Sequence, residues 1–384
     1  MLSHSRQMRT ASRTTPHPLI QAHLAEDGTH ASQALTRAVD VGRLLRIRRG
    51  VYLNPAVWLQ APPWDRHLLA IAATALWTPE GVFCRQTGLA AHGVHQLATP
   101  DAVHLRTWLR QTAGVRAAPR MTGQAEPGRV AELLRSIDET AHDSRRRLPG
   151  MADLAGVPTR RVFASAPMRA AAAEGLLPTP STTHVQMPKA GSLELSGLPA
   201  AVEPLGLVLA DTVPRMDPTA AAVVLDSVRS GRCTTGHRWT LDDVGAWVPL
   251  ITSGRARQRW ELAWARSDAG AESVGESLTR LRVGQLGFET PETQVEFILL
   301  DGSVARVDLF WRSAGIVGEF DGRTKYTRDG VLGNRDVSEV VHQEKVREDG
   351  LRELGLGVVR FLWQDLHALD ALHRKLVKAR VPRA

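Results

Sequence analysis

Cysteine is scarce in this sequence: only Cys84 and Cys233 occur, far apart and without a CxxC or histidine companion pattern. This spacing argues against a disulfide scaffold and against a structural zinc site. Long apolar runs are missing too, since the most apolar stretch, Leu68 to Trp77, has about half the length that a membrane-spanning helix needs. The N-terminus lacks the charged-then-apolar pattern of a signal peptide. We therefore expect a cytoplasmic protein without a membrane partner.

Acidic residues are fewer than basic ones. The 384 residues include 40 Asp and Glu against 48 Lys and Arg, a formal net charge of +8. Most of the basic residues are arginine, whose planar fork suits phosphate groups, so the balance favours an acidic partner such as nucleic acid. With 43% hydrophobic residues, the chain is long enough to bury ample core in two or three domains.

The N-terminal segment combines helical spacing with an arginine-rich hairpin pattern. Residues 1–16 are polar and aperiodic, and they predict a disordered tail. Helical spacing follows over residues 19–24 and again over 32–38. Residues 45–53, LRIRRGVYL, then alternate apolar side chains with arginines around an Arg-Gly turn, which indicates two short strands.

Two helices followed by a basic hairpin predict a winged helix-turn-helix over residues 17–60. The first 60 residues hold eight arginines against three acids, a surplus of +5. In such a module the second helix enters the major groove of DNA and the wing follows the phosphates. Alternatively, the arginines of the hairpin only solvate an exposed strand. The candidate DNA-binding residues are Arg37, Arg43, Arg46, Arg48 and Arg49.

The middle of the chain, residues 61–265, predicts a helical or mixed region. Residues 64–77 favour one long helix, and helical signals return at 205–210 and 220–230. Residues 111–196 are rich in Pro, Gly, Ala and Arg with weak periodicity, so we expect a flexible insertion there.

The last segment, residues 266–384, alternates helices and strands clearly. We therefore expect a multidomain α/β (α+β) protein in which this segment forms one core of helix, three-strand meander, helix and strand, closed by a further helix. The predicted helices are 271–283, 338–354 and 365–378, and the predicted strands are 294–300, 304–311, 315–321 and 358–362.

Carboxylates interrupt the apolar strands of this core. Asp308 lies in the second strand, while Glu319 and Asp321 lie two positions apart, and so on one face, in the third. With Glu276 from the first helix, these groups would repel each other unless a cation were bound. Oxygen ligands alone favour Mg²⁺ or Mn²⁺, ions that activate water against phosphodiesters. Alternatively, the acids form salt bridges with Arg306, Lys345 or Arg347.

These residues and their order resemble the PD-(D/E)XK nuclease superfamily, in particular its Vsr-like domains. The matching pieces are Glu276, Arg306-Val307-Asp308, Glu319-Phe320-Asp321-Gly322 and residues 344–349, EKVRED. The resemblance implies a metal-dependent DNA endonuclease with Asp308 and Glu319 as metal ligands and Glu276 as an auxiliary carboxylate. Asp321 stands where the motif has lysine, and the displaced ammonium would come from Lys325 or Lys345.

Residues 44–53 and 85–94, LLRIRRGVYL and RQTGLAAHGV, resemble the winged-helix domain of AbiEi-type antitoxins. That resemblance implies promoter binding and a nucleotidyltransferase toxin as partner. It supports a second hypothesis of another class, a non-enzymatic DNA-binding regulator whose nuclease-like domain is inactive or serves as an interaction platform.

Overall fold

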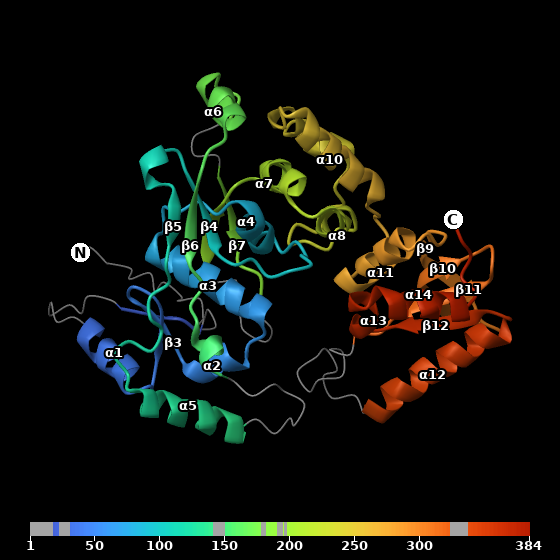
Figure 1. The fold of residues 1–384 in the computed structure, drawn as a ribbon, viewed down its shortest axis with the longest axis horizontal. Helices are drawn as coiled ribbons and strands as arrows, with labels where there is room; N and C mark the ends of the chain where they lie inside the picture. Colours follow the sequence, from blue (N-terminus) through green and yellow to red (C-terminus); the bar gives the residue numbers. More distant parts are fainter. Residues whose placement is uncertain are drawn as a thin grey trace, which may run out of the picture. The chain divides into compact units, whose positions relative to one another are not determined.

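The computed structural model describes residues 18–22, 31–140, 150–177, 182–189, 195, 198–322 and 337–384. The described residues form a mixed α/β fold (Figure 1). The chain divides into two compact units, and the segments of its middle part belong alternately to one unit and to the other. The first unit comprises Met1–Phe83, Asp101–Phe163 and Thr182–Val202, and the second comprises Cys84–Pro100, Ala164–Ser181 and Glu203–Ala384. This division differs from boundaries at residues 60 and 265, because strands after residue 100 return to the first unit. The predicted tail, 1–16, lies outside the described residues.

The first unit begins with a small antiparallel sheet of order β1-β3-β2. Strands β2 (Leu45–Arg48) and β3 (Val51–Leu53) form the predicted hairpin, and Gly50 provides its turn with a φ of +75°. Helix α1 (Ala31–Asp40) confirms the second predicted helix. Within the predicted first helix, however, β1 (Ile20–Gln21) pairs with β3, Ile20 opposite Tyr52. A helix of so few residues is marginal alone, and a free strand edge offers its backbone better partners.

Helices α2 (Pro55–Gln60) and α3 (Pro63–Trp77) follow, and α3 confirms the long helix predicted there. Next comes a sheet of order β4-β6-β5, in which β4 (Val103–Thr107) and β6 (Thr159–Phe163) are parallel. Phe83 bridges both to Leu105 and to Val202 of a neighbouring hairpin. The remaining elements of this unit are η1 (Arg110–Thr112), β5 (Gly114–Arg116), α5 (Pro127–Thr140), η2 (Met151–Leu154), β7 (Thr183–Gln186) and β8 (Pro199–Val202).

The flexible insertion expected at 111–196 is therefore wrong for the described residues. Met121, Val130 and Val162 are buried in this stretch, and β6 carries paired strands on both edges. The sequence of β6, TRRVF, does not alternate, and its partners β4 and β5 are distant in sequence, so the local pattern did not predict this strand.

The second unit contains a helical part around a buried cluster that includes Leu89, Leu209, Leu225 and Trp260. Helices α7 and α8 confirm the helical signals at 205–210 and 220–230. The helices of this part are α4 (Arg85–Ala91), α6 (Ala166–Ala173), α7 (Leu205–Thr212), η3 (Val213–Arg215), α8 (Pro218–Arg229), α9 (Leu241–Gly245), η4 (Val248–Leu250) and α10 (Gly254–Arg266).

The C-terminal part of this unit confirms the predicted order of helices and strands up to residue 361, with a four-stranded sheet of order β12-β11-β10-β9, whereas the single helix predicted at 365–378 is two helices, broken at Ala368. Strand β12 is parallel to β11, and the other pairs are antiparallel. The elements are α11 (Val274–Gln285), β9 (Glu292–Ile298), β10 (Val304–Trp311), β11 (Ile316–Phe320), α12 (Val337–Glu353), β12 (Gly357–Phe361), α13 (Trp363–His367) and α14 (Leu369–Lys378).

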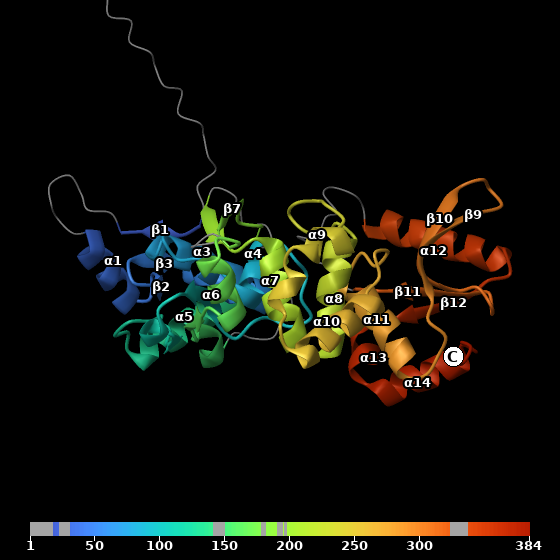
Figure 2. The same cartoon turned by 90° about the horizontal axis from the view of Figure 1, so that it is seen from above.

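Helices cover both faces of this sheet. On one face Val307 and Val317 pack with Leu351 of α12. On the other, Leu309 and Phe361 join residues of α11, α13 and α14 in a second cluster. Figure 2 shows β11 and β12 between α12 and the pair α13 and α14. The end of β10 and β11, where their ladder stops at Leu309 and Gly318, is where the acidic residues lie.

Candidate functional site

The hairpin of the first unit does not expose all of its arginines. Arg48 is only 3% exposed, and its Nε donates a 2.8 Å hydrogen bond to Thr74 Oγ1 of α3. Burial lowers the pKa of Arg48 to about 10. The prediction that Arg48 lies on a wet face and contacts phosphate is therefore wrong: a bulge between Arg46 and Arg48 turns its side chain inward.

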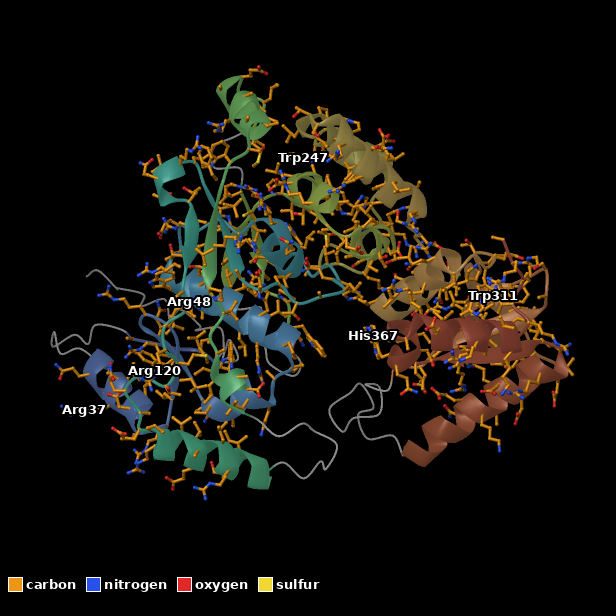
Figure 3. The ribbon with its side chains drawn as sticks, in the orientation of Figure 1. Arg37, Arg48, Arg120, Trp247, Trp311 and His367 are labelled. Atoms are coloured by element: carbon orange, nitrogen blue, oxygen red, sulfur yellow. The ribbon has the colours of Figure 1, made fainter. Side chains whose placement is uncertain are left out.

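The other basic candidates remain accessible to different degrees. Arg37, Arg43 and Arg49 are exposed, and Figure 3 shows Arg37 on the outer side of α1. Arg46 is half-buried, with its guanidinium carbon 6.0 Å from the centre of the Tyr52 ring. Of the five candidate arginines, three are thus exposed, one is half-buried and one is buried.

In the second unit, Glu276 lies in the first turn of α11. Ser273 caps this helix, since its Oγ accepts the N–H of Glu276 at 3.2 Å. Oε2 of Glu276 accepts the backbone N–H of Glu272 at 2.9 Å and Nε2 of Gln294 at 2.8 Å. Glu272 itself precedes the helix, so the acids at 272 and 276 do not share one helical stripe.

Asp308 and Glu276 lie close enough to interact. Burial, and after it the charge of Asp308, raises the pKa of Glu276 above its usual value, against the hydrogen bonds from Glu272, Ser273 and Gln294. Oδ2 of Asp308 accepts the backbone N–H of Phe320 at 2.8 Å. Asp308 is thereby joined to the residue next to Glu319, across the end of the β10–β11 ladder.

The backbone is irregular at Asp308. Val307 and Leu309 pack into different clusters, on opposite faces of the sheet, although a regular strand would turn both to one face. Between the pairs Val307–Val295 and Leu309–Thr293, Asp308 lies opposite Gln294, whose φ is +55°. A left-handed glutamine is uncommon, and here it points its amide at Glu276.

A single glycine allows α11 to lie close to β11. A Cβ atom at Gly275 would overlap with the ring of Phe320. Because Glu276 follows Gly275 and the N–H of Phe320 holds Asp308, this contact positions two of the acids.

Glu319 is paired with an arginine of α12. Nη1 of Arg347 donates to Oε1 of Glu319 at 3.0 Å and to the carbonyl of Arg306 at 2.9 Å. The side chains are 33% and 14% exposed, so the pair is largely shielded from water. The predicted salt bridge between Arg347 and Glu319 is thus present.

Of the two candidate lysines, Lys345 does not approach the carboxylates. Lys345 is exposed and stands two residues before Arg347 on α12, about 200° around the helix, so it points away from the sheet face. The prediction that Lys345 reaches the acids is wrong for that reason. Lys325 lies outside the described residues.

Asp321 follows the end of β11, and its charge acts on Arg360 of β12. Although partial burial opposes the change, Glu348, Glu344 and Asp321 raise the pKa of Arg360. Asp308 therefore acts electrostatically on Glu276, and Glu319 is one residue from the amide that holds Asp308.

Within the described part of the chain, no group of three or more His, Cys, Asp or Glu side chains is placed to hold a metal ion. The expected set of three carboxylates around one cation is thus not assembled there. Asp308 and Glu319 are the oxygen donors that could hold an ion jointly with water or phosphate.

Sequence patterns did not single out Gln294, or Arg232 as a partner of Glu272. Oε2 of Glu272 pairs with Arg232 at 2.5 Å and with Arg306 at 2.9 Å. A glutamine in a strand carries no signal of its own, and Arg232 is 40 residues away from Glu272 in the sequence.

Among the described residues, no helix has both the length and the apolar character needed to cross a membrane. Comparison of the chain with protein-family models, with curated proteins and with solved structures finds no match.

Proposed function

We propose that the chain is a DNA-binding protein whose second unit hydrolyses DNA phosphodiesters with Mg²⁺ or Mn²⁺. The observation that carries this proposal is the arrangement at the end of the β10–β11 ladder: Asp308 accepts the N–H of Phe320, next to Glu319, and lies opposite Gln294, which donates to Glu276. The order of elements around them supports a PD-(D/E)XK-like core, in agreement with the motif resemblance.

Asp308 and Glu319 would hold the ion. A divalent ion bound there would neutralise phosphate charge and lower the pKa of a bound water. Mg²⁺ commonly uses one or two carboxylates and completes its coordination with water and substrate phosphate, so this donor set fits it. After burial, the negative charge of Asp308 is the next cause of the raised pKa of Glu276. A bound cation would relieve this repulsion between the two carboxylates.

The remaining residues divide the work of positioning and proton transfer. Glu276, with its raised pKa, can take up the proton that an attacking water gives up. Gln294 and the N–H of Glu272 hold its carboxylate in place. Arg347 can exchange Glu319 for the scissile phosphate, because a guanidinium binds either anion through the same donors.

Plasmid nicking tests the proposal. With Mg²⁺ or Mn²⁺ the wild type is expected to convert supercoiled plasmid to the nicked form, and EDTA should stop it. Asp308→Asn should slow nicking about 100-fold, since it removes a charged ligand while keeping the shape. Asp301→Asn is the matched control, because Asp301 is exposed in the β9–β10 turn and bonds only Ser303 in the contacts of the described residues. Equal rates for wild type and Asp308→Asn would refute this active site.

The role of Arg347 gives a second prediction. Arg347→Ala should slow nicking about tenfold or more, and Arg347→Lys should restore part of the rate, because lysine keeps the charge but not the fork. Lys345→Ala should match the wild type, since Lys345 points away from the sheet. Initial rates at saturating Mg²⁺ check this order. A Lys345→Ala rate as low as that of Arg347→Ala would contradict it.

A second candidate function is favoured by two observations. Glu319 is already neutralised by Arg347, and Asp321 stands in the place of the motif lysine. A domain without activity would leave a DNA-binding regulator of the AbiEi antitoxin type, with Arg37, Arg43 and Arg49 on phosphates and a toxin as partner. No nicking with any metal or DNA form, together with DNA binding that is lost in Arg43→Ala/Arg49→Ala, would favour it.

A further inference from the structure

We propose that an arginine-lined pocket of the second unit, beside the carboxylates, binds backbone phosphates of a nucleic acid strand. The pocket has a volume of about 480 Å³ and opens between the segment after α8 and strands β9 and β10. We call it the arginine pocket, and three arginines give it its character: Arg232, Arg238 and Arg306.

The charges of the arginine pocket are unbalanced. Its lining carries three guanidinium groups against one carboxylate, that of Glu272. Arg232 and Arg306 both pair with the same oxygen of Glu272, at 2.5 and 2.9 Å. Arg238 is exposed, and no ion pair is found for it among the described residues. Glu272 thus holds two arginines toward one point, where a phosphate oxygen could replace its carboxylate.

The arginine pocket continues into the carboxylate site. Gln294 lines the pocket and also donates to Glu276. Arg306 precedes Asp308 by two residues, and its carbonyl accepts from Arg347. A strand whose phosphates lie on Arg232 and Arg306 would therefore have its neighbouring phosphodiester near Asp308. The placement of that phosphodiester near Asp308 rests on the proposed function, whereas the binding of phosphates in the arginine pocket does not.

The lining also indicates what is recognised. It consists of arginines, Glu272, Gln294 and the small residues Ser230, Gly231, Ala269 and Gly270, without an aromatic ring on which a base could stack. Guanidinium groups without stacking or base-edge contacts position the backbone and carry no sequence information. We therefore expect binding that is independent of sequence and steeply dependent on salt.

The test measures binding of the full chain to a short labelled duplex of random sequence, by fluorescence anisotropy in EDTA over a series of NaCl concentrations. The background is Arg43→Ala/Arg49→Ala, which removes the basic hairpin. Adding Arg232→Ala/Arg238→Ala should weaken binding about 10- to 100-fold and reduce the slope of log K against log salt by about two. Adding Glu272→Gln instead should strengthen binding severalfold, since both arginines lose their internal partner.

Arg374→Ala is the matched control, because Arg374 is exposed on α14 and outside the arginine pocket. It should leave the affinity unchanged, and all variants should melt at the same temperature. Unchanged affinity in Arg232→Ala/Arg238→Ala, or weaker binding in Glu272→Gln, overturns the proposal. High concentrations of inorganic phosphate at constant ionic strength should compete with the duplex only where Arg232 and Arg238 are present, because both ligands would use the same guanidinium groups. Phosphate binding that depends on Arg232 and Arg238, without any loss of duplex affinity in Arg232→Ala/Arg238→Ala, would show a site for free anions and overturn the strand assignment.

Because EDTA prevents metal-dependent cleavage, the two proposals fail separately. Duplex binding through the arginine pocket without nicking in Mg²⁺ would reject the nuclease alone. Nicking with full affinity in Arg232→Ala/Arg238→Ala would reject the pocket alone.

Discussion

Arg280→Met is expected to lower the free energy of unfolding of the second unit by about 3–5 kcal/mol. Arg280 of α11 and Asp226 of α8 are 7% and 1% exposed, and Nη2 of Arg280 lies 3.0 Å from Oδ2 of Asp226. Burial already raises the pKa of Asp226 against the charge of Arg280. Without the guanidinium, the carboxylate would be left in the core with the N–H of Asp268 as its main remaining donor.

Urea unfolding and hydrogen exchange of α8 and α11 amides would measure this loss. Asp226→Leu/Arg280→Met should recover most of the stability, because no charge is then left buried. In Arg280→Met alone the loss should shrink as the pH falls, since the raised pKa of Asp226 lets the folded state take up a proton. A loss below about 1 kcal/mol, or an equal loss in the double variant, would contradict this account of the pair.

Acidification is expected to destabilise the first unit by about 3 kcal/mol through His67. His67 of α3 is 1% exposed, and neither ring nitrogen has a hydrogen-bond partner among the described residues. Burial, together with the charges of His104 and Arg48 and against that of Asp101, lowers its pKa from 6.5 to about 4. The unfolded chain binds the proton more tightly, so this stability is complete above pH 6.5 and is lost as the pH falls toward 4.

Unfolding of the first unit at a series of pH values between 6.5 and 4 would show the slope. His67→Leu should flatten it, because leucine fills the site without a titrating group. His184→Leu, at an exposed histidine of the same unit, should leave the slope as in the wild type. If His67→Leu keeps the full slope, other groups cause the acid sensitivity.

The C-terminal core was predictable because its signals are local. Residues 304–311 were predicted as a strand and form β10 with those bounds, since apolar alternation ends at a turn on each side. The Asp301-Gly302 turn fixes the pairing of β9 and β10, and Gly302 has a φ of +84°. The hairpin register then predicts Asp308 beside β11, as the pairing of β10 with β11 confirms.

The first unit was harder to predict because its elements depend on contacts distant in sequence. Ile20 forms a strand only because β3 offers an edge. Strand β6 needs β4 and β5 on its two sides. Arg48 is buried because Thr74, 26 residues later, accepts its hydrogen bond. None of these partners can be recognised from the sequence pattern of the element that it contacts.

At the candidate site, the sequence predicted the types of the residues better than the directions in which their side chains point. Alternation assigns Val307 and Leu309 to one face, but the strand is irregular at Asp308. The motif suggested Lys345, whereas helical geometry turns Arg347 toward Glu319. Which charged group of a helix faces the sheet depends on the helix phase, and that phase is set by packing residues such as Leu351.

A genetic screen of this protein would misassign the role of Gly275. This glycine bears no functional group, yet any side chain there would push the Phe320 ring and, with it, the amide that holds Asp308. A collection of random substitutions ranked by loss of the proposed nicking activity would therefore place this position beside the acids themselves. Such a screen would detect a spacer that holds Asp308 and Glu276 in position, and would mark it as though it carried a functional group.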